Sequence, residues 1–117
     1  MDIKQYIKDT LEHEDIIKLL GDKRVFFLHA TTPITPYVEY EIVAEYGEDY
    51  SENQETYTSY TVQVDIYSKG NYSEIERQIK QQMRLNSFSR DMAADLYEED
   101  TKLYHKSMRF NISLEMD

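Results

Sequence analysis

The chain has 117 residues, enough for one domain, and its 40% hydrophobic content is typical of a folded protein rather than a disordered one. Its 23 acidic and 13 basic residues give a net charge of −10, which disfavours binding to nucleic-acid phosphates or to an anionic membrane surface. The absence of cysteine excludes a disulfide framework, a thiol nucleophile and a cysteine-ligated zinc site, and no apolar run approaches membrane-spanning length.

The N-terminal segment has helical periodicity. An apolar stripe that begins at Ile3 predicts a helix over residues 2–20. The polar sequence EHED interrupts this stripe, so we expect a bend or a break into two short helices there. Gly21 is a natural helix terminator. A short β-like run follows at residues 24–30, and two prolines make residues 31–36 a loop.

Alternating residues predict two long strands, at residues 37–46 and 56–68, joined by an acidic loop. One face of the first strand is expected to carry Val38, Tyr40, Ile42, Ala44 and Tyr46. Its other face would then carry Tyr37, Glu39, Glu41, Val43 and Glu45. In the second strand, the residues expected to face inward are Tyr60, Val62, Val64 and Ile66, while the residues expected to face outward are Thr61, Gln63, Asp65 and Tyr67.

A second helix is predicted over residues 72–85. The pattern Ser-x-x-Glu at Ser73 and Glu76 fits a capping box, and Glu76 and Lys80 have the spacing of a favourable ion pair on one helix face. An apolar stripe with a spacing of four residues is expected to pack on the sheet: Ile75, Ile79 and Met83.

The remaining sequence predicts a strand around residues 92–97, a hairpin turn at EEDT and a last alternating strand. One face of that last strand carries Tyr104, Met108, Phe110, Ile112 and Leu114. The element order predicts an α+β fold in a single domain over residues 1–117. We expect a mostly antiparallel sheet with two helices, the N-terminal one and the one near residues 72–85, packed on one face.

No pattern of a reaction centre is found. The sequence HEDII has Ile17 where a zincin motif needs its second histidine. The loop at residues 49–55 has oxygen ligands at alternate positions, as a calcium loop has, but Gln54 replaces the required glycine and Tyr60 the required glutamate. The carboxylates of DLYEED would be exposed at a hairpin tip. We therefore expect no enzyme activity, no cofactor and no metal site.

Several segments, in order, resemble the tail-completion proteins of long-tailed bacteriophages, also called tail terminator or head–tail joining proteins. The resembling segments are LLGDKRVFFLHA, TPITPYVEYEIV, YTVQVDIYSKGNYSEIERQIKQQM and DLYEEDTKLYHKSMRFNISLEM. They cover nearly the whole chain. The match is to the order of the segments rather than to a single motif.

This resemblance implies an α+β subunit without enzyme activity that forms a ring, expected to be a hexamer, at the head-proximal end of the tail tube. Such a ring ends tube polymerisation and joins the tail to the head. The implied partners are further copies of the chain, the tail tube protein and head–tail connector proteins, and the implied place is the virion tail, assembled in the host cytoplasm. The alternative is a small soluble protein-binding module of phage or bacterial origin without a virion role.

In such a ring, DNA passes through the lumen without specific binding. Carboxylates that line the lumen would repel the DNA phosphates, whereas lysine and arginine would retain them. The candidates for an acidic lumen or interface face are Glu39, Glu41, Glu45, Glu48, Asp49 and Glu52. The competing interpretation is that these glutamates form the solvated face of an antiparallel strand, and the sequence leaves both open.

Overall fold

The computed structural model of the chain describes residues 2–48 and 57–115. The candidate residues Asp49 and Glu52, and the calcium-like pattern at residues 49–55, lie outside the described residues.

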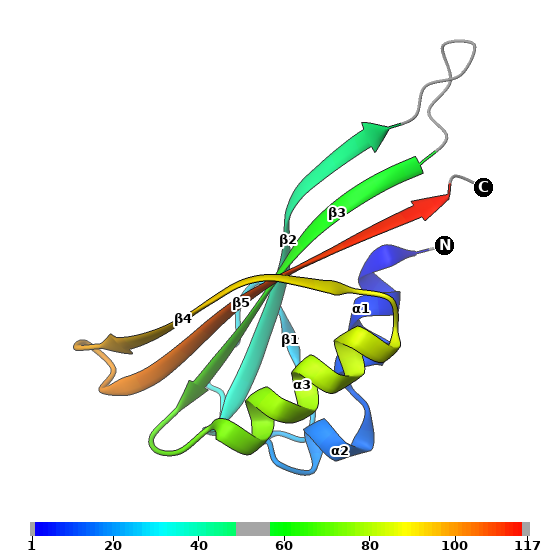
Figure 1. Ribbon diagram of the computed structural model, residues 1–117. Coiled ribbons are helices and arrows are strands. Elements are labelled where there is room, and N and C mark those ends of the chain that lie inside the picture. Colours follow the sequence, from blue (N-terminus) through cyan, green and yellow to red (C-terminus); the bar gives the residue numbers. More distant parts are fainter. Residues whose placement is uncertain (1, 49–56, 116–117) are drawn as a thin grey trace.

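The described strands form one sheet with the order β1-β2-β3-β5-β4 (Figure 1). Their bounds are β1 Phe26–Phe27, β2 Tyr37–Glu48, β3 Tyr57–Ser68, β4 Ser89–Glu98 and β5 Leu103–Glu115. β1 pairs with β2 in parallel, and the other neighbouring pairs are antiparallel. Two hairpins therefore build most of the sheet, as the short connections between the predicted strands indicate.

The helices of the described residues cover one face of this sheet: α1 (Ile3–Leu11), α2 (Glu14–Ile17) and α3 (Ser73–Leu85) (Figure 1). The predicted break is confirmed between α1 and α2, where the His13 Nδ1 accepts a hydrogen bond of 3.1 Å from the Asp15 backbone N–H and caps α2. Side chains with at most 1% exposure fill the space between helices and sheet, among them Ile7, Leu11, Ile79, Met83, Val62, Val64, Met108 and Phe110. The predicted α+β fold is confirmed.

The start of α3 differs from the predicted capping box. The helix begins at Ser73 itself, with Tyr72 at the N-cap position, and no side chain caps it from there. Instead, the Asn71 Oδ1 accepts a hydrogen bond of 2.8 Å from the Ser73 backbone N–H. The predicted ion pair within the helix is confirmed, since the Lys80 Nζ lies 2.5 Å from the Glu76 Oε2.

A β-bulge in β2 inverts the alternation of its side chains. The register shifts between Ile42 and Ala44, so that Glu45 pairs with Tyr60 and Tyr46 with Ser59. Paired residues of antiparallel strands project to the same side of the sheet, and Tyr60 packs against the core. Glu45 therefore lies on the side of the sheet that carries the helices, and the 60% exposed Tyr46 lies on the opposite side.

The predicted faces of β2 are accordingly wrong beyond the bulge. Glu45 does not share a face with Glu39 and Glu41. Ala44, which pairs with Thr61, and Tyr46 do not share a face with Val38 and Tyr40. The physical reason is the extra residue of the bulge, because one inserted residue sends every following side chain of a strand to the other face.

Candidate assembly surface

The helix-free side of the sheet, called the outer face below, is polar along its centre. Cross-strand hydrogen bonds connect β3 to β5 in successive steps: Ser59 to Ser113 at 2.6 Å, Thr61 to Asn111 at 2.9 Å and Arg109 to Gln63 at 3.1 Å. Each bond joins directly opposed residues. The centre of the outer face is therefore a polar surface whose side chains are hydrogen-bonded to one another across the strands.

The next step of this row holds a buried carboxylate. Asp65 is 6% exposed, and its Oδ1 lies 2.7 Å from the His105 Nε2. The Gln63 side-chain amide donates to both Asp65 oxygens, at 3.1 and 3.3 Å. The Tyr67 ring stacks on the His105 ring with a centroid distance of 4.3 Å, and Tyr37 stacks on Tyr67 at 4.8 Å.

The contacts of this pair stabilise its charged form. Burial raises the pKa of the Asp65 carboxyl, but the hydrogen bonds from His105 and Gln63 outweigh it and hold that pKa below its usual value. The hydrogen bond to Asp65 raises the pKa of the His105 imidazole. The other ring nitrogen, Nδ1, lies 3.5 Å from the Glu98 Oε2. Because both nitrogens face carboxylates, His105 joins β3 to the β4–β5 hairpin, and these contacts favour the protonated form of its ring.

The structure brings only some of the predicted acidic residues together. Glu39 and Glu41 lie on the outer face, opposite Asp65 and Gln63. The Glu39 Oε2 accepts a hydrogen bond of 2.7 Å from the Ala30 backbone N–H, so this residue anchors the loop before β2.

At the far end of β2, Glu48 also lies on the outer face, where its carboxylate accepts a hydrogen bond of 2.7 Å from the Ser59 hydroxyl. Glu45 is separated from the other described candidates by the sheet. The described part of the acidic face is therefore the outer-face set Glu39, Glu41 and Glu48.

A second polar cluster, which the sequence did not predict, lies on the helix side at the base of the β4–β5 hairpin. Lys106 is only 8% exposed, and its Nζ lies 3.1 Å from the Asp95 Oδ1 and 3.5 Å from the Glu76 Oε1. The Tyr72 hydroxyl donates to Asp95, and this hydrogen bond raises the pKa of Tyr72 to about 12. The sequence feature that could have revealed this cluster is Lys106, a charged residue at an inward position of the alternating last strand.

This cluster lines a cleft of about 640 Å³ between the start of α3 and the strands β4 and β5, with Tyr104 on its rim. A smaller cleft of about 330 Å³ lies between α1 and α3, next to His13 and Gln82. Within residues 2–48 and 57–115, no group of three or more histidine, aspartate or glutamate side chains is placed to hold a metal ion.

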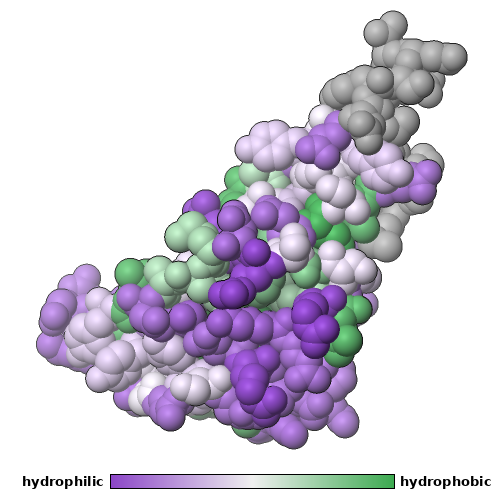
Figure 2. Space-filling model, in the orientation of Figure 1, coloured by the Kyte–Doolittle hydropathy of each residue, from purple (hydrophilic) through white to green (hydrophobic). Residues whose placement is uncertain are grey.

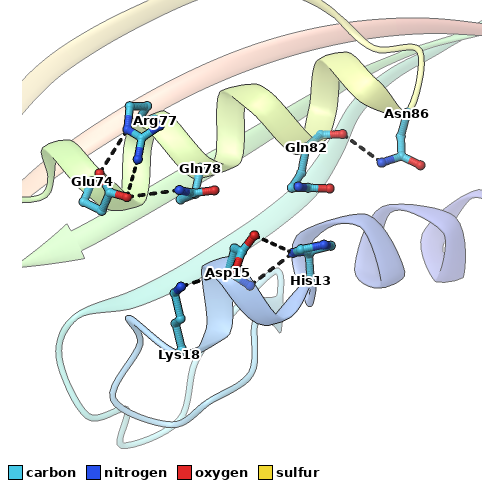
Figure 3. Close-up of polar contacts among 8 residues, drawn as sticks. All are labelled: His13, Asp15, Lys18, Glu74, Arg77, Gln78, Gln82 and Asn86. Atoms are coloured by element: carbon cyan, nitrogen blue, oxygen red, sulfur yellow. Dashed lines mark hydrogen bonds and ion pairs between the residues drawn. The ribbon is translucent and has the colours of Figure 1, made fainter.

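Many charged side chains of the helices form ion pairs with other residues of the helices. In α3, Arg77 binds Glu74 at 2.6 Å, and beside it Lys18 lies 3.3 Å from Asp15 of α2 (Figure 3). Each of these pairs joins residues three positions apart on exposed helical surface, where such pairs stabilise a helix only slightly. The charges on this part of the surface are therefore neutralised locally.

These observations define the class of the protein as an α+β domain with a polar, partly acidic outer face and a second polar cluster at the base of the β4–β5 hairpin. No family model matches the sequence, and a search of curated proteins finds no match. The chain is similar to a chain in a solved structure titled "Virion of native gene transfer agent (GTA) particle", with a TM-score of 0.62 and 9% sequence identity. The likeness covers 94% of this chain and 92% of that one, and at this identity it shows a shared fold.

Proposed function

We propose that the chain is a structural virion protein that forms a ring at the head-proximal end of a phage tail tube, ends the polymerisation of the tube and joins the tail to the head. The observation that carries this proposal is the fold, shared over nearly the full length of both chains with a chain from a virion particle. The segment order of the sequence supports it independently, through the resemblance to tail-completion proteins.

The shape of the molecule suits a subunit that bridges two neighbours. Its extents are 52 × 28 × 24 Å, because β2, β3 and β5 continue beyond the helical layer (Figure 1). An elongated subunit of this kind offers one end to the tube and the other to the head. On this proposal the protein acts by binding alone, without enzyme activity. None of the described helices has the length and apolar character needed to cross a bilayer.

The test uses the tail tube protein of the same phage. Tube protein is polymerised with and without the purified chain, and tube lengths are measured by negative-stain electron microscopy. We expect unlimited elongation without the chain, and short tubes that carry a ring at one end with it. In infected cells, loss of the chain is expected to give overlong tails and unattached heads.

The control is the same chain after heat denaturation, which leaves its composition and charge unchanged. Identical tube lengths in both samples, together with normal head attachment in cells that lack the chain, would overturn the proposal. Capture of a host protein without any effect on tubes would favour the alternative, a soluble protein-binding module.

A further inference from the structure

The strands β4 and β5 form a projecting hairpin that carries both acidic side chains and exposed apolar side chains. Residues 95–104, called the arm below, contain four carboxylates and one lysine, a net charge of −3. Three large apolar or aromatic side chains of the arm are about half exposed: Leu96 at 48%, Tyr97 at 45% and Tyr104 at 46%. Figure 1 shows the hairpin extending past the start of α3, away from the helical layer.

The turn from α3 into β4 has the opposite charge. Residues 84–92, called the corner below, contain two arginines and one aspartate, a net charge of +1 in a chain of −10. Arg84 and Arg90 are exposed, and neither forms an ion pair with another described residue. Leu85 is 60% exposed and Met92 52%. Figure 2 shows hydrophobic surface next to strongly hydrophilic surface on this side.

The arginines of the corner and the tip of the arm lie at opposite ends of β4, which joins the two surfaces. Arg90 and Glu98 are eight residues apart in this strand, a separation of about 26 Å at 3.3 Å per residue. The tip of the arm therefore cannot reach the corner arginines of its own chain.

We infer that the arm of one copy docks on the corner of the next copy, so that identical subunits associate head to tail. Two different surfaces of one molecule that complement each other give a heterologous contact, which closes into a ring when the rotation between subunits allows it. Both surfaces combine exposed apolar groups with opposite charge, which is the composition that brings two patches together and fixes their register. This inference deepens the proposed function and rests on it for the ring.

The contact is made through side chains rather than by addition of a strand to the free edge of β4. The register of β4 against β5 shifts between Arg90 and Ala93, and a bulge of this kind disrupts the regular edge that a new strand needs. The arm also offers a place for an arginine. The cleft at its base is lined by the Tyr72 and Tyr104 rings and by the Asp95 and Glu76 carboxylates. Lys106 contacts both carboxylates but leaves part of the Asp95 side chain exposed, and guanidinium groups bind both carboxylates and aromatic faces.

Charge reversal tests the contact. Arg84→Glu with Arg90→Glu on the corner, and Glu99→Lys with Asp100→Lys on the arm, should each weaken association at least tenfold in sedimentation velocity. The combination of both pairs should restore it. The matched control is Lys18→Glu with Lys23→Glu, which changes the net charge by the same amount as the corner pair but lies outside both surfaces. Equal weakening by control and corner variants would overturn the inference.

Disulfide trapping tests the orientation, and the absence of native cysteine makes it specific. Asp100→Cys and Ser89→Cys are placed in separate chains, and oxidation is carried out on capped tubes and on the concentrated protein alone. Mixed chains should form heterodimers, whereas each variant alone should remain monomeric. A chain with both substitutions should give a ladder that ends at a closed ring. Homodimers of a single variant would show a two-fold contact and overturn the inference.

These experiments distinguish a failure of the proposed function from a failure of the arm–corner contact. Rings on tube ends without the arm–corner crosslink would leave the proposed function intact and refute this contact. Crosslinks in the concentrated protein, with tubes that elongate freely, would support the contact and refute the role in tail completion. The absence of both would refute both.

Discussion

The His105 Nε2 lies 2.7 Å from the Asp65 Oδ1 across the centre of the outer face. The two residues are diagonal neighbours, since His105 is paired with Tyr67 and Asp65 with Ser107. Diagonal contacts lie within reach of long or aromatic side chains. Their side chains are 12% and 9% exposed, so this pair is nearly buried at one end of the row of cross-strand hydrogen bonds that Arg109 and Gln63 also form.

Removal of one partner of this pair should be costly. His105→Ala leaves the Asp65 carboxylate buried without its main counter-charge, and such a change costs about 3 kcal/mol of unfolding free energy. Asp65→Asn combined with His105→Gln should destabilise by less than the sum of the two single changes, because no charge is left uncompensated. Urea denaturation measures all three. The control is His29→Gln at an exposed position, and a loss in His105→Ala no larger than in the control would contradict the prediction.

The stability of the fold should depend on pH through the same pair. The folded-state pKa of His105 is raised, so its contribution is fully present below the unfolded value of 6.5 and is lost as the pH rises through the folded value. The folded-state pKa of Asp65 is lowered, so its contribution is present above the unfolded value of 3.8 and is lost as the pH falls through the folded value. The pair therefore stabilises most between these two unfolded values.

Thermal unfolding across this range checks the expectation. The wild-type Tm should fall as the pH is raised above 6.5, and His105→Gln should lack this decline, since it has no imidazole to lose a proton. Glu98 and Glu39 also face His105 and raise its folded-state pKa, so the same scan on Glu98→Gln should give a smaller decline that ends at lower pH. Parallel curves for wild type and His105→Gln would refute the assignment.

The sequence predicts the helices and strands of this structure better than the irregularities within them. The helices and strands follow from apolar periodicity, because burial of one stripe is a local property of the chain. The bulge at Val43 does not. Three consecutive apolar residues, Ile42, Val43 and Ala44, interrupt the alternation there, but no glycine or proline marks where the register shifts. Its position is set by pairing with β3, a long-range effect.

The polar contacts show the same limit. The outward position of Asp65 is predicted by alternation, but its contact with His105, which in turn contacts Glu98 of the arm, depends on the pairing of β3 with β5. Lys106 is visible in the sequence as a charge on an apolar stripe. Its partners Glu76 and Asp95 come from other elements, so their identity needs the packed structure.

Gly21 is required by close packing rather than by its backbone angles. A Cβ at this position would lie 2.3 Å from the Ile34 carbonyl oxygen, and the Gly21 N–H donates to the Pro36 carbonyl at 2.9 Å. Gly21→Ala therefore forces the loop before β2 to shift, and we expect a loss of about 1–3 kcal/mol. Gly70→Ala is the matched control, because nothing lies within 4 Å of its added Cβ. Chemical denaturation of both variants that gave equal midpoints would contradict this assignment.

The last prediction separates the two faces of the acidic strand. Glu41 lies on the outer face with Glu39 and Glu48, whereas the bulge places Glu45, only four residues on, on the helix side. A strand presents one face to a ring lumen, so the two glutamates cannot both line it. If the proposed ring turns its outer face to the DNA, Glu41→Lys adds attraction for phosphate and should slow DNA ejection, more strongly at low salt. Glu45→Lys carries the same charge change, and particles with it should eject DNA at the wild-type rate. The rate for Glu41→Gln should lie between the rates for the two lysine variants.

Particles of both lysine variants must first be intact and full in the electron microscope. Slow ejection in Glu45→Lys alone would assign the helix side to the lumen, and wild-type kinetics in both would leave the glutamates as a solvated face.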